Sequence, residues 1–265
     1  MPRQITAFSN STVKLLRSLR DKKARRAEGL FLAEGLRILT EARDSGRLPE
    51  IVAFSAEGAR HPLAAEIIAA TEAAGGDAVE TTPDILSKMS GKDNPQMLLG
   101  AYRQPVTSLE AIDRSKSPLW IVAQALRDPG NIGTILRTGD AVGAGGLVLI
   151  DDSADPFSVE AVRASMGALF TQDIATARWE EFRPWLRGGH GQLVGTSLKA
   201  THDYLEAEYR EPCFLLIGNE QQGLPADYEA ECDLLVKIPM AGRADSLNAA
   251  MATAVMAFAI KASWR

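Results

Sequence analysis

Short apolar runs alternate with helix-forming segments along most of this chain of 265 residues, and this alternation limits the fold more than any other feature. In the second half the runs cover 119–125, 146–151, 193–196, 214–218 and 234–238. They are short and continuously apolar, as strands are when helices cover both faces of a parallel sheet. Helices are expected at 131–142, 158–169 and 246–262. The sequence therefore predicts an α/β domain with a parallel sheet.

The first hundred residues show the same alternation on a smaller scale. Helices are predicted at 11–27, 35–45, 62–74 and from Pro83 onward, and strands at 30–33, 50–54, 78–81 and 97–102. The stretch 105–117 is polar, charged and bracketed by prolines, which is typical of a linker. We therefore expect a small α/β domain over 1–104, a linker over 105–117 and a larger domain over 118–265.

Composition excludes several classes of protein. Hydrophobic residues make up 46% of the chain, which is enough for a core without disulfides. The two cysteines form no CxxC pair and the three histidines are scattered, so no metal site is expected. The longest apolar run, 249–260, is too short to span a bilayer, and the first residues contain no apolar signal segment. The sequence predicts a cytoplasmic protein without membrane contact.

The charge is unevenly distributed, although the net charge is only −5. The first thirty residues carry eight basic and two acidic side chains, whereas residues 105–265 carry 14 basic and 21 acidic ones. A basic segment on an acidic protein attracts polyanions through phosphate contacts, but charge alone favours a solvated helix face. Val13, Leu16 and Leu19 lie at helical spacing, so the segment is amphipathic in either interpretation.

Three glycine-bearing motifs each follow a predicted strand: DPGNIGTILRT (128–138), LLIGNEQQGL (215–224) and IPMAGRADSLN (238–248). The first opens a helix whose free N–H groups and dipole suit an anion, and Arg137 follows about two turns later. The other two combine polar side chains with glycines, which let backbone approach a ligand closely. A capped helix or a loop also explains each motif alone, and Ser246 is then the N-cap of the last helix.

Other catalytic signatures are missing or misplaced. The chain has neither the phosphate-binding motif GxxxxGK[ST] nor the nucleophile motif G-x-S-x-G. Its sequence also gives no indication of a catalytic Cys–His pair. The glycines at 143–146 match a dinucleotide fingerprint loosely, but they precede a strand, whereas a Rossmann turn follows one. A helix stop explains these glycines better.

Taken in this order, the three motifs resemble those of the SpoU-type (TrmH-like) RNA 2′-O-ribose methyltransferases of the SPOUT superfamily. VRASMGALF (162–170) and VGTSL (194–198) are similar to further family segments, and 1–104 resembles the family's L30e-like RNA-binding extension. The resemblance implies a deep trefoil knot within 118–265, a feature that is rare in proteins. It also implies S-adenosylmethionine as cofactor, RNA as partner and a homodimer formed through the C-terminal domain.

The resemblance assigns roles to particular residues. The cofactor pocket would involve Thr196, Gly218, Asn219, Ile238, Met240 and Leu247, partly through backbone groups. The catalytic motif positions are matched by Asn131, Arg137, Glu220, Ser246 and Asn248. Phosphate contacts are expected from Lys14, Arg17, Lys22, Lys23, Arg25 and Arg26. A methyl group would pass to a ribose 2′-oxygen, with Arg137 stabilising the alkoxide or accepting its proton, and Asn131 orienting Arg137 or the ribose.

Alternatives stay open at this point. The same fold without activity would be an RNA-binding module with a vestigial knot, against which the intact polar motif residues argue. A Rossmann-type enzyme would use NAD(P) and would leave the basic helix unexplained. Among RNAs, a 23S-like ribosomal RNA is favoured over a transfer RNA, because the N-terminal extension resembles those of ribosomal RNA enzymes. Gly139, Gln221–Gln222 and Ala249–Ala250 depart from common family residues, which bears on the choice of substrate.

Overall fold

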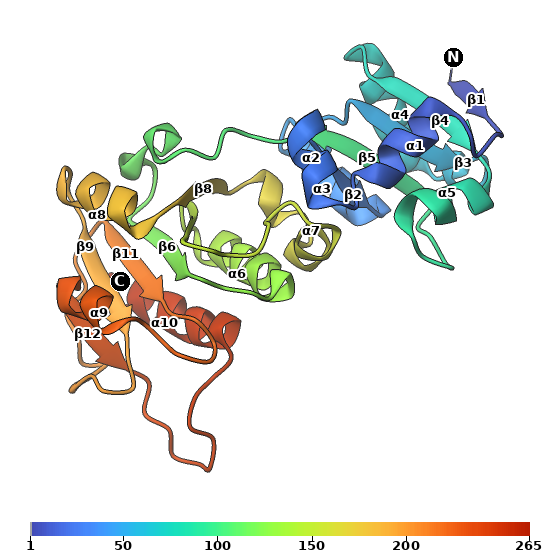
Figure 1. Ribbon diagram of the computed structural model, residues 1–265. Coiled ribbons are helices and arrows are strands. Elements are labelled where there is room, and N and C mark those ends of the chain that lie inside the picture. Colours follow the sequence, from blue (N-terminus) through green and yellow to red (C-terminus); the bar gives the residue numbers. More distant parts are fainter. Residues whose placement is uncertain (1) are drawn as a thin grey trace. The chain divides into compact units, whose positions relative to one another are not determined.

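The computed structural model describes residues 2–265, which form two compact α/β units (Figure 1). The first unit contains the chain up to Pro105 together with Asp155–Phe170, and the second contains Val106–Ala154 and Thr171–Arg265. The predicted α/β class is confirmed. The sequence-based domain limits stay a prediction, and the grouping of Asp155–Phe170 with the first unit had no sequence signal.

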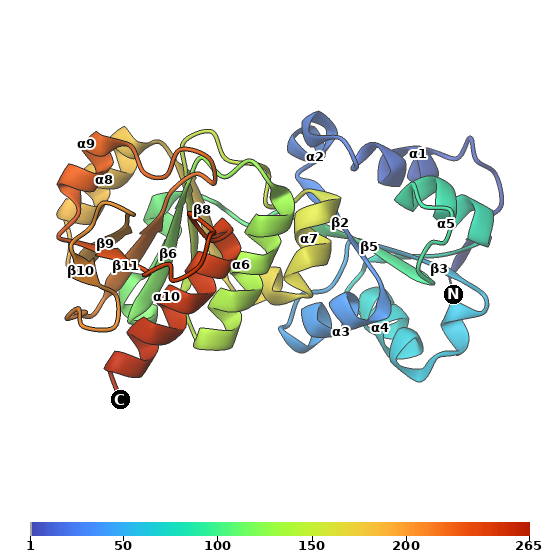
Figure 2. The same ribbon diagram turned by 90° about the horizontal axis from the view of Figure 1, so that it is seen from below.

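The first unit is built on a five-stranded sheet. Its strand order is β1 (Arg3–Ile5), β4 (Asp77–Thr81), β3 (Ile51–Ser55), β5 (Leu98–Arg103) and β2 (Leu30–Glu34). β5 is antiparallel to both of its neighbours, whereas β1, β4 and β3 are parallel. The helices are α1 (Ser11–Ser18), α2 (Lys22–Glu28), α3 (Leu36–Asp44), α4 (Pro62–Ala73), α5 (Pro83–Ser90) and α7 (Val159–Ser165), with 3-10 turns at Gly58–Arg60 and Ala168–Phe170. Figure 2 shows α1 and α5 on one face of this sheet and α3 and α4 on the other.

The basic N-terminal segment forms two helices instead of the single helix predicted over 11–27. The side chain of Asp21 accepts hydrogen bonds from two backbone N–H groups of the following turn, and it thereby starts α2 as an N-cap. The predicted apolar stripe is confirmed, because Val13, Leu16 and Leu19 are fully buried in the core of the first unit.

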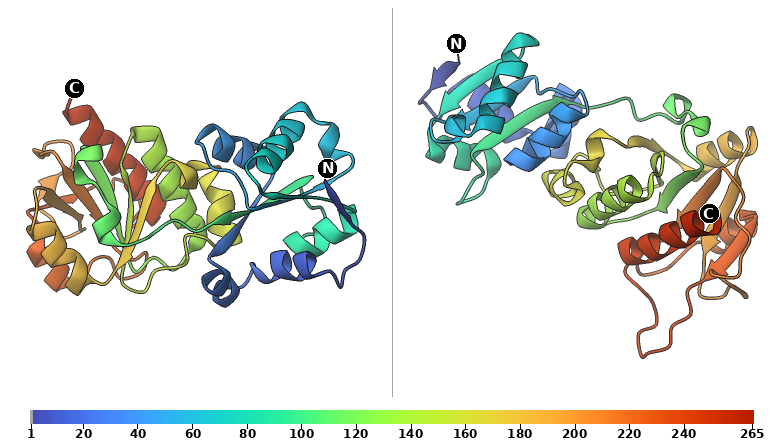
Figure 3. Two further views of the ribbon diagram at one scale, coloured as in Figure 1. Left: turned by 90° about the horizontal axis from the view of Figure 1, so that it is seen from above. Right: turned by 180° about the vertical axis from the view of Figure 1, so that it is seen from behind.

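The second unit is built on a seven-stranded sheet in which all neighbouring strands are parallel. Its order is β10 (His202–Asp203), β12 (Leu234–Lys237), β9 (Gln192–Thr196), β11 (Cys213–Ile217), β6 (Leu119–Gln124), β7 (Gly146–Ile150) and β8 (Asp173–Ala177). The helices are α6 (Pro129–Val142), α8 (Trp179–Arg187), α9 (Ala226–Glu231) and α10 (Ala249–Ser263), with 3-10 turns at Leu109–Ala111 and Arg114–Lys116. α6 and α10 lie side by side on one face, and α8 covers the other (Figures 2 and 3). The predicted parallel sheet is confirmed, while the knot stays a prediction.

The core of the second unit joins its strands to α8. Trp120 from β6 and Phe182 from α8 are fully buried in it, and Leu109 and Ile112 from the predicted linker pack into the same core. Neither β8 nor α8 was predicted from the sequence. β8 is an edge strand interrupted by the polar Asp173 and Thr176, and Pro184 argues against a helix at α8 although Trp179, Phe182 and Leu186 follow helical spacing.

Two observations bear on the expected absences. Within residues 2–265, no helix has both the length and the apolarity that crossing a membrane requires. In the same range no three His, Cys, Asp or Glu side chains are grouped as metal ligands would be.

Cys213 and Cys232 are free thiols, and burial raises the pKa of each to about 12. Both thiols are therefore protonated at neutral pH, which makes them weak nucleophiles.

Candidate active site

The three glycine-bearing motifs meet at one edge of the second sheet. The first motif follows β6, the second follows β11 and the third follows β12. Because the strands are parallel, their carboxyl ends lie at the same edge, where open α/β sheets bind ligands. β6 and β11 are direct neighbours, and Ala123 is paired with Ile217 close to the ends of both strands. The fold therefore brings together segments that are far apart in the sequence, such as Asn131 and Asn248, which are separated by 117 positions.

A chain of side-chain hydrogen bonds joins the three motifs. Asn248 Nδ2 donates to Asn131 Oδ1 over 3.0 Å, and Asn131 Nδ2 donates to Glu220 Oε1 over 2.8 Å. The direction is fixed, because Asn248 Oδ1 already accepts two backbone N–H groups as the N-cap of α10. Asn131 is buried, so both ends of its amide are satisfied inside the protein. Asn131 thus holds the second and third motifs against the start of α6.

Arg137 is placed differently from the other motif residues. It lies six residues beyond Asn131 on α6 and is exposed. Among residues 2–265, no side chain is hydrogen-bonded or ion-paired with its guanidinium. Asn131 makes no hydrogen bond to Arg137 in this structure, and the expectation that it orients Arg137 or the ribose stays a prediction. The Arg137 guanidinium is consequently free to meet an incoming anion.

The loop of the second motif requires its glycines. A Cβ atom on Gly218 would lie 2.3 Å from the carbonyl carbon of Gly223, closer than any side chain can approach. Gly223 has a φ of +69°, a left-handed conformation that glycine adopts without strain. Asn219 fixes this loop to the end of β6, because its Nδ2 donates to the carbonyl of Ala125 over 2.8 Å. The loop is therefore tightly folded and tethered to the end of β6.

A cavity of about 260 Å³ opens beside this loop. All six residues predicted to hold the cofactor line it: Thr196, Gly218, Asn219, Ile238, Met240 and Leu247. They come from the ends of β9 and β11 and from the loop after β12, so three separate segments form its wall. Small side chains and exposed backbone groups provide the shape and hydrogen bonds that a nucleoside requires.

Ser246 and Glu220 also line the cavity. The prediction that the last helix starts at Ser246 is wrong, because α10 begins at Ala249 with Asn248 as its N-cap. The Asn248 amide takes this position by accepting two of the free N–H groups of the first turn. The Ser246 hydroxyl is consequently available to a ligand.

Three charged residues of the cavity wall carry no sequence signal. Lys199, Lys237 and Glu229 line it, and no motif marks them. In the part of the chain that the structure describes, none of the three side chains is hydrogen-bonded or ion-paired. The cavity therefore presents both signs of charge to a ligand, and the side chains could be identified only once the fold had brought them together.

Comparison with known proteins now decides the family. A sequence model of the SpoU rRNA Methylase family matches residues 118–258, which is more than half of the chain. The chain belongs to the SpoU rRNA methylase family. A model of the MRM3-like substrate binding domain matches residues 10–100. The resemblance inferred from the three motifs is confirmed.

Individual relatives of this SpoU-family chain match along nearly its whole length. It is 30% identical to a 23S rRNA (uridine(2479)-2′-O)-methyltransferase of Streptomyces viridochromogenes, over 91% of the chain and 85% of that protein. It is 28% identical to the 23S rRNA (guanosine(2553)-2′-O)-methyltransferase RlmP of Bacillus subtilis, over 98% of the chain and 99% of RlmP. The AdoMet-bound crystal structure of an rRNA methyltransferase from Sinorhizobium meliloti is 39% identical, with a TM-score of 0.90 over 98% of this chain and 97% of the other.

The six basic residues expected to contact phosphate in this SpoU-family chain fall into two groups. Five of them are exposed and have no ion-pair partner among residues 2–265: Lys14, Arg17, Lys22, Lys23 and Arg26. They lie on α1 and α2, within the region that matches the substrate-binding domain. These five side chains can reach a phosphate.

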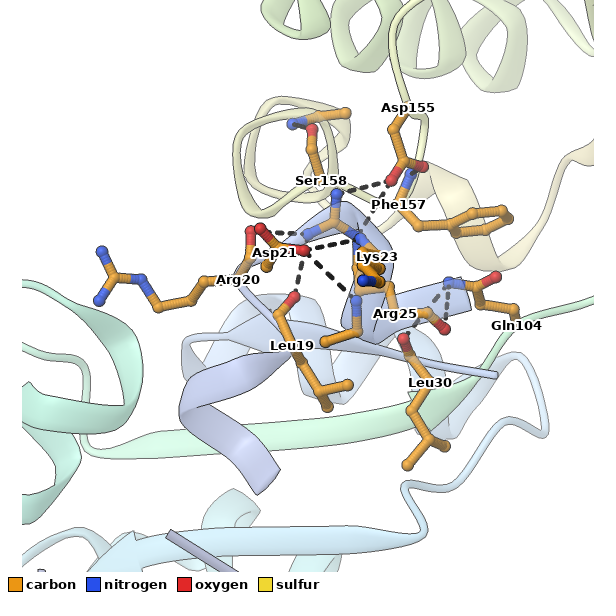
Figure 4. A network of polar contacts seen from close by, with 12 residues as sticks. Leu19, Arg20, Asp21, Lys23, Arg25, Leu30, Gln104, Asp155, Phe157 and Ser158 are labelled. Atoms are coloured by element: carbon orange, nitrogen blue, oxygen red, sulfur yellow. Dashed lines mark hydrogen bonds and ion pairs between the residues drawn. The ribbon is translucent and has the colours of Figure 1, made fainter. Parts of the chain in front are cut away.

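Arg25 has a different environment, and its expected phosphate contact is contradicted by the structure. It is only 3% exposed and forms an ion pair of 2.6 Å with Asp155 (Figure 4). Its Nη1 donates to the carbonyls of Leu19 and Arg20 over 2.9 and 2.8 Å. The guanidinium is thus buried and held by protein groups, so it is not accessible to RNA.

Arg20 was not selected from the sequence but belongs with the exposed group. It lines an open surface hollow together with Lys14, Arg17, Ser18 and Asp21. Three cations around one concave surface attract a phosphate more strongly than the same charges spread over a helix. The signal was its spacing, since positions 14, 17 and 20 recur every three residues along one side of this segment.

Proposed function

We propose that this protein transfers a methyl group from S-adenosylmethionine to a ribose 2′-hydroxyl of ribosomal RNA, of the 23S type. The observation that carries the proposal is the cavity that the second and third motifs form with the end of β9, lined by every residue expected to hold the cofactor. The names of its relatives, which are 23S rRNA 2′-O-methyltransferases, support the same reaction. The AdoMet-bound structure from Sinorhizobium meliloti supports the cofactor.

The residues of the cavity fit this cofactor. S-adenosylmethionine supplies a methyl group on a positively charged sulfur, and it carries an ammonium, a carboxylate and a nucleoside. The Gly218–Gly223 loop lines the cavity, and its tight fold needs glycine because a Cβ on Gly218 would collide with the backbone of Gly223. Lys199 and Lys237 can bind a carboxylate, and Glu229 can accept hydrogen bonds from an ammonium or from hydroxyl groups.

The reaction needs an oxygen nucleophile held in line with the methyl group. The carbon–sulfur bond breaks as the carbon–oxygen bond forms, and the 2′-hydroxyl proton passes to solvent. We assign Arg137 to the alkoxide or the adjacent phosphate, because a planar guanidinium can donate two hydrogen bonds to either. It acts as a cation, since a guanidinium holds its protons too tightly to accept another group's proton. Asn131 and Asn248 hold the motifs in register, which keeps the reacting atoms aligned.

The proposal is tested by calorimetry and by methyl transfer. The purified protein is titrated with S-adenosylmethionine and then incubated with the radiolabelled cofactor and 23S rRNA, 16S rRNA or transfer RNA. We expect saturable heat and label in a ribose of 23S rRNA. A catalytically inactive RNA-binding module would give no heat, and a nicotinamide enzyme would bind NAD(P) instead. Label in transfer RNA instead would contradict the proposed ribosomal RNA substrate. An rRNA substrate also supports the expected cytoplasmic location.

The basic hollow and its surroundings are proposed to bind RNA phosphates. Substituting Lys14, Arg17 and Arg20 by alanine together should lower the salt dependence of RNA affinity, with the slope of log K against log salt becoming about 2 smaller for single-stranded RNA. Filter binding over a series of salt concentrations measures this slope. The matched control replaces the exposed Arg47, Arg60 and Lys88 by alanine in the same unit. Equal slopes for the two triple variants would contradict the assignment.

We propose that a homodimer forms through α10. Met251 and Phe258 on this helix are 63% and 55% exposed, and Val255 lies between them at helical spacing. Exposed large apolar side chains in a row indicate a protein interface. α10 packs beside α6, the helix that carries Arg137, and Arg137 does not line the cavity of its own chain. A second copy seated on this face is therefore positioned to supply the arginine.

Charging this face should separate the subunits. Light scattering after gel filtration is expected to give twice the chain mass of 28.5 kDa for the natural protein. The Met251→Glu, Phe258→Glu variant should have the mass of one chain, because burying two carboxylates costs several kcal/mol. Val106→Glu, at a residue 75% exposed in the same unit, is the control and should leave the mass unchanged. A natural protein with the mass of one chain would refute the dimer.

A further inference from the structure

Residues Asp155–Phe170, here named the strap, leave the second unit after β7 and belong to the compact first unit. The strap is packed closely there. The rings of Phe157 and Phe170 pack in tilted orientation against Phe31 at centroid distances of 5.3 and 5.9 Å, and the Phe170 ring also lies 4.8 Å from that of Tyr102. A Cβ on Gly167 would lie 2.6 Å from the Cβ of Glu41 on α3. The strap therefore packs against α3 at Gly167, where only a residue without a side chain fits. Both ends of the strap are therefore anchored.

Arg25 connects the strap to the helices that carry the RNA-contacting residues. Its Nε and Nη2 both donate to Asp155 Oδ2, over 3.0 and 2.6 Å. Its Nη1 donates to the carbonyls of Leu19 and Arg20, which follow the last turn of α1 (Figure 4). Asp155 in turn accepts the N–H of Phe157 on its other oxygen. One buried cation thus joins the end of α1, the helix α2 and the first residue of the strap.

The residues just before the strap are bonded to the loop that opens the first motif. Ala154 N donates to the carbonyl of Leu126 over 2.7 Å. Asp151 Oδ2 accepts from Gln124 Nε2 over 3.2 Å and from the Tyr228 hydroxyl over 2.9 Å. All these contacts lie within the second unit. A single peptide bond, between Ala154 and Asp155, therefore links the set of contacts around Arg25 to the set around the first motif.

We propose that the Arg25–Asp155 ion pair is a positioning device that couples RNA bound on α1 and α2 to the loop preceding Asn131. This inference rests on the proposed function. A phosphate seated at Lys14, Arg17 and Arg20 restrains the end of α1, and Arg25 passes that restraint to the strap. Ala154 then passes it to the carbonyl of Leu126, five residues before Asn131. Arg25 and Asp155 touch neither cofactor nor RNA, so they act through other residues.

The coupling is tested first in the natural protein by hydrogen exchange. Backbone amides of 151–154, 126–128 and 130 should exchange several-fold more slowly when an rRNA fragment is bound. The Lys14→Ala, Arg17→Ala, Arg20→Ala variant, at RNA concentrations that saturate it, should lose this protection. This readout is independent of methyl transfer, so it separates a failure of the inference from a failure of the proposed function. Exchange that is unchanged by RNA at both segments would overturn the inference.

The ion pair is then replaced by apolar side chains in Arg25→Met, Asp155→Leu, because such replacements of buried pairs commonly preserve folding. The affinities for RNA and for S-adenosylmethionine should change by less than about threefold, while kcat falls at least tenfold and KM is little changed. A purely structural role would lower thermal stability without lowering kcat at a nearly unchanged KM. The control is Arg103→Met, Glu50→Leu, which removes an exposed ion pair of the same unit. A folded double variant with the natural kcat would refute the inference, and RNA-dependent exchange decides the question if the variant does not fold.

Discussion

Replacing Arg137 by alanine is expected to lower the rate of methyl transfer by about 10²–10³-fold, the usual cost of losing one group that stabilises a developing oxyanion. The affinity for S-adenosylmethionine should not change, because Arg137 does not line the cavity and has no partner among residues 2–265. Single-turnover assays with labelled cofactor measure the rate, and calorimetry measures the affinity. A loss confined to the rate identifies a residue that acts on the RNA side of the reaction.

Two further variants test whether the loss of rate is specific to the Arg137 guanidinium. Arg137→Lys keeps the charge but not the planar fork, so it should recover only part of the rate. Arg183→Ala removes an exposed arginine that pairs with Glu231 in the same unit, and it should behave as the natural protein. Turnover of Arg137→Ala within a few-fold of the natural rate would exclude Arg137 both as stabiliser and as base.

Replacing Asn131 by aspartate is expected to lower activity and cofactor affinity about 10- to 100-fold at pH 8, equivalent to the 1–3 kcal/mol cost of an unsatisfied buried polar group. The new carboxylate can still accept the hydrogen bond from Asn248, but it cannot donate to Glu220, whose oxygen lies 2.8 Å from the present amide nitrogen. Two carboxylates at this distance in a buried site repel each other, which raises the pKa of the pair.

The pH dependence of Asn131→Asp distinguishes this mechanism from simple misfolding. As the pH falls below the raised pKa, one of the two carboxyl groups becomes protonated and can donate the missing hydrogen bond. Cofactor affinity of the variant should therefore improve on acidification from pH 8 to pH 6, relative to the natural protein. Asn10→Asp is the matched control, because Asn10 accepts a hydrogen bond as the N-cap of α1 and aspartate caps equally well. A variant with pH-independent affinity would contradict the role given to Asn131.

Local chemistry explains what could be predicted. The loop at 218–223 needs glycines because of contacts within six residues, so its motif is visible in the sequence. The same holds for the strands of the second sheet, whose burial on both faces leaves continuous apolar runs. The residues that line the cavity were predicted from the resemblance, because residues that match a family's motifs are expected at the corresponding places of its fold.

Other features depend on partners distant in sequence. Arg25 and Arg26 are adjacent and chemically identical, yet Arg25 is buried and Arg26 is exposed. The difference arises from Asp155, which lies 130 positions away and meets Arg25 only after the strap has packed on the first unit. Charge counting cannot make this distinction, because it treats each cation as solvated.

By itself, the sequence determined the α/β class, the parallel second sheet, the three motifs and the family, because each of these follows from side-chain patterns within short segments. The tertiary structure decided that Asn131 links Glu220 to Asn248, that Ser246 faces the cavity, and that the strap lies on the first unit. Those facts concern pairs of groups that are far apart along the chain. Their hydrogen bonds form only where burial removes the water that would otherwise compete for them.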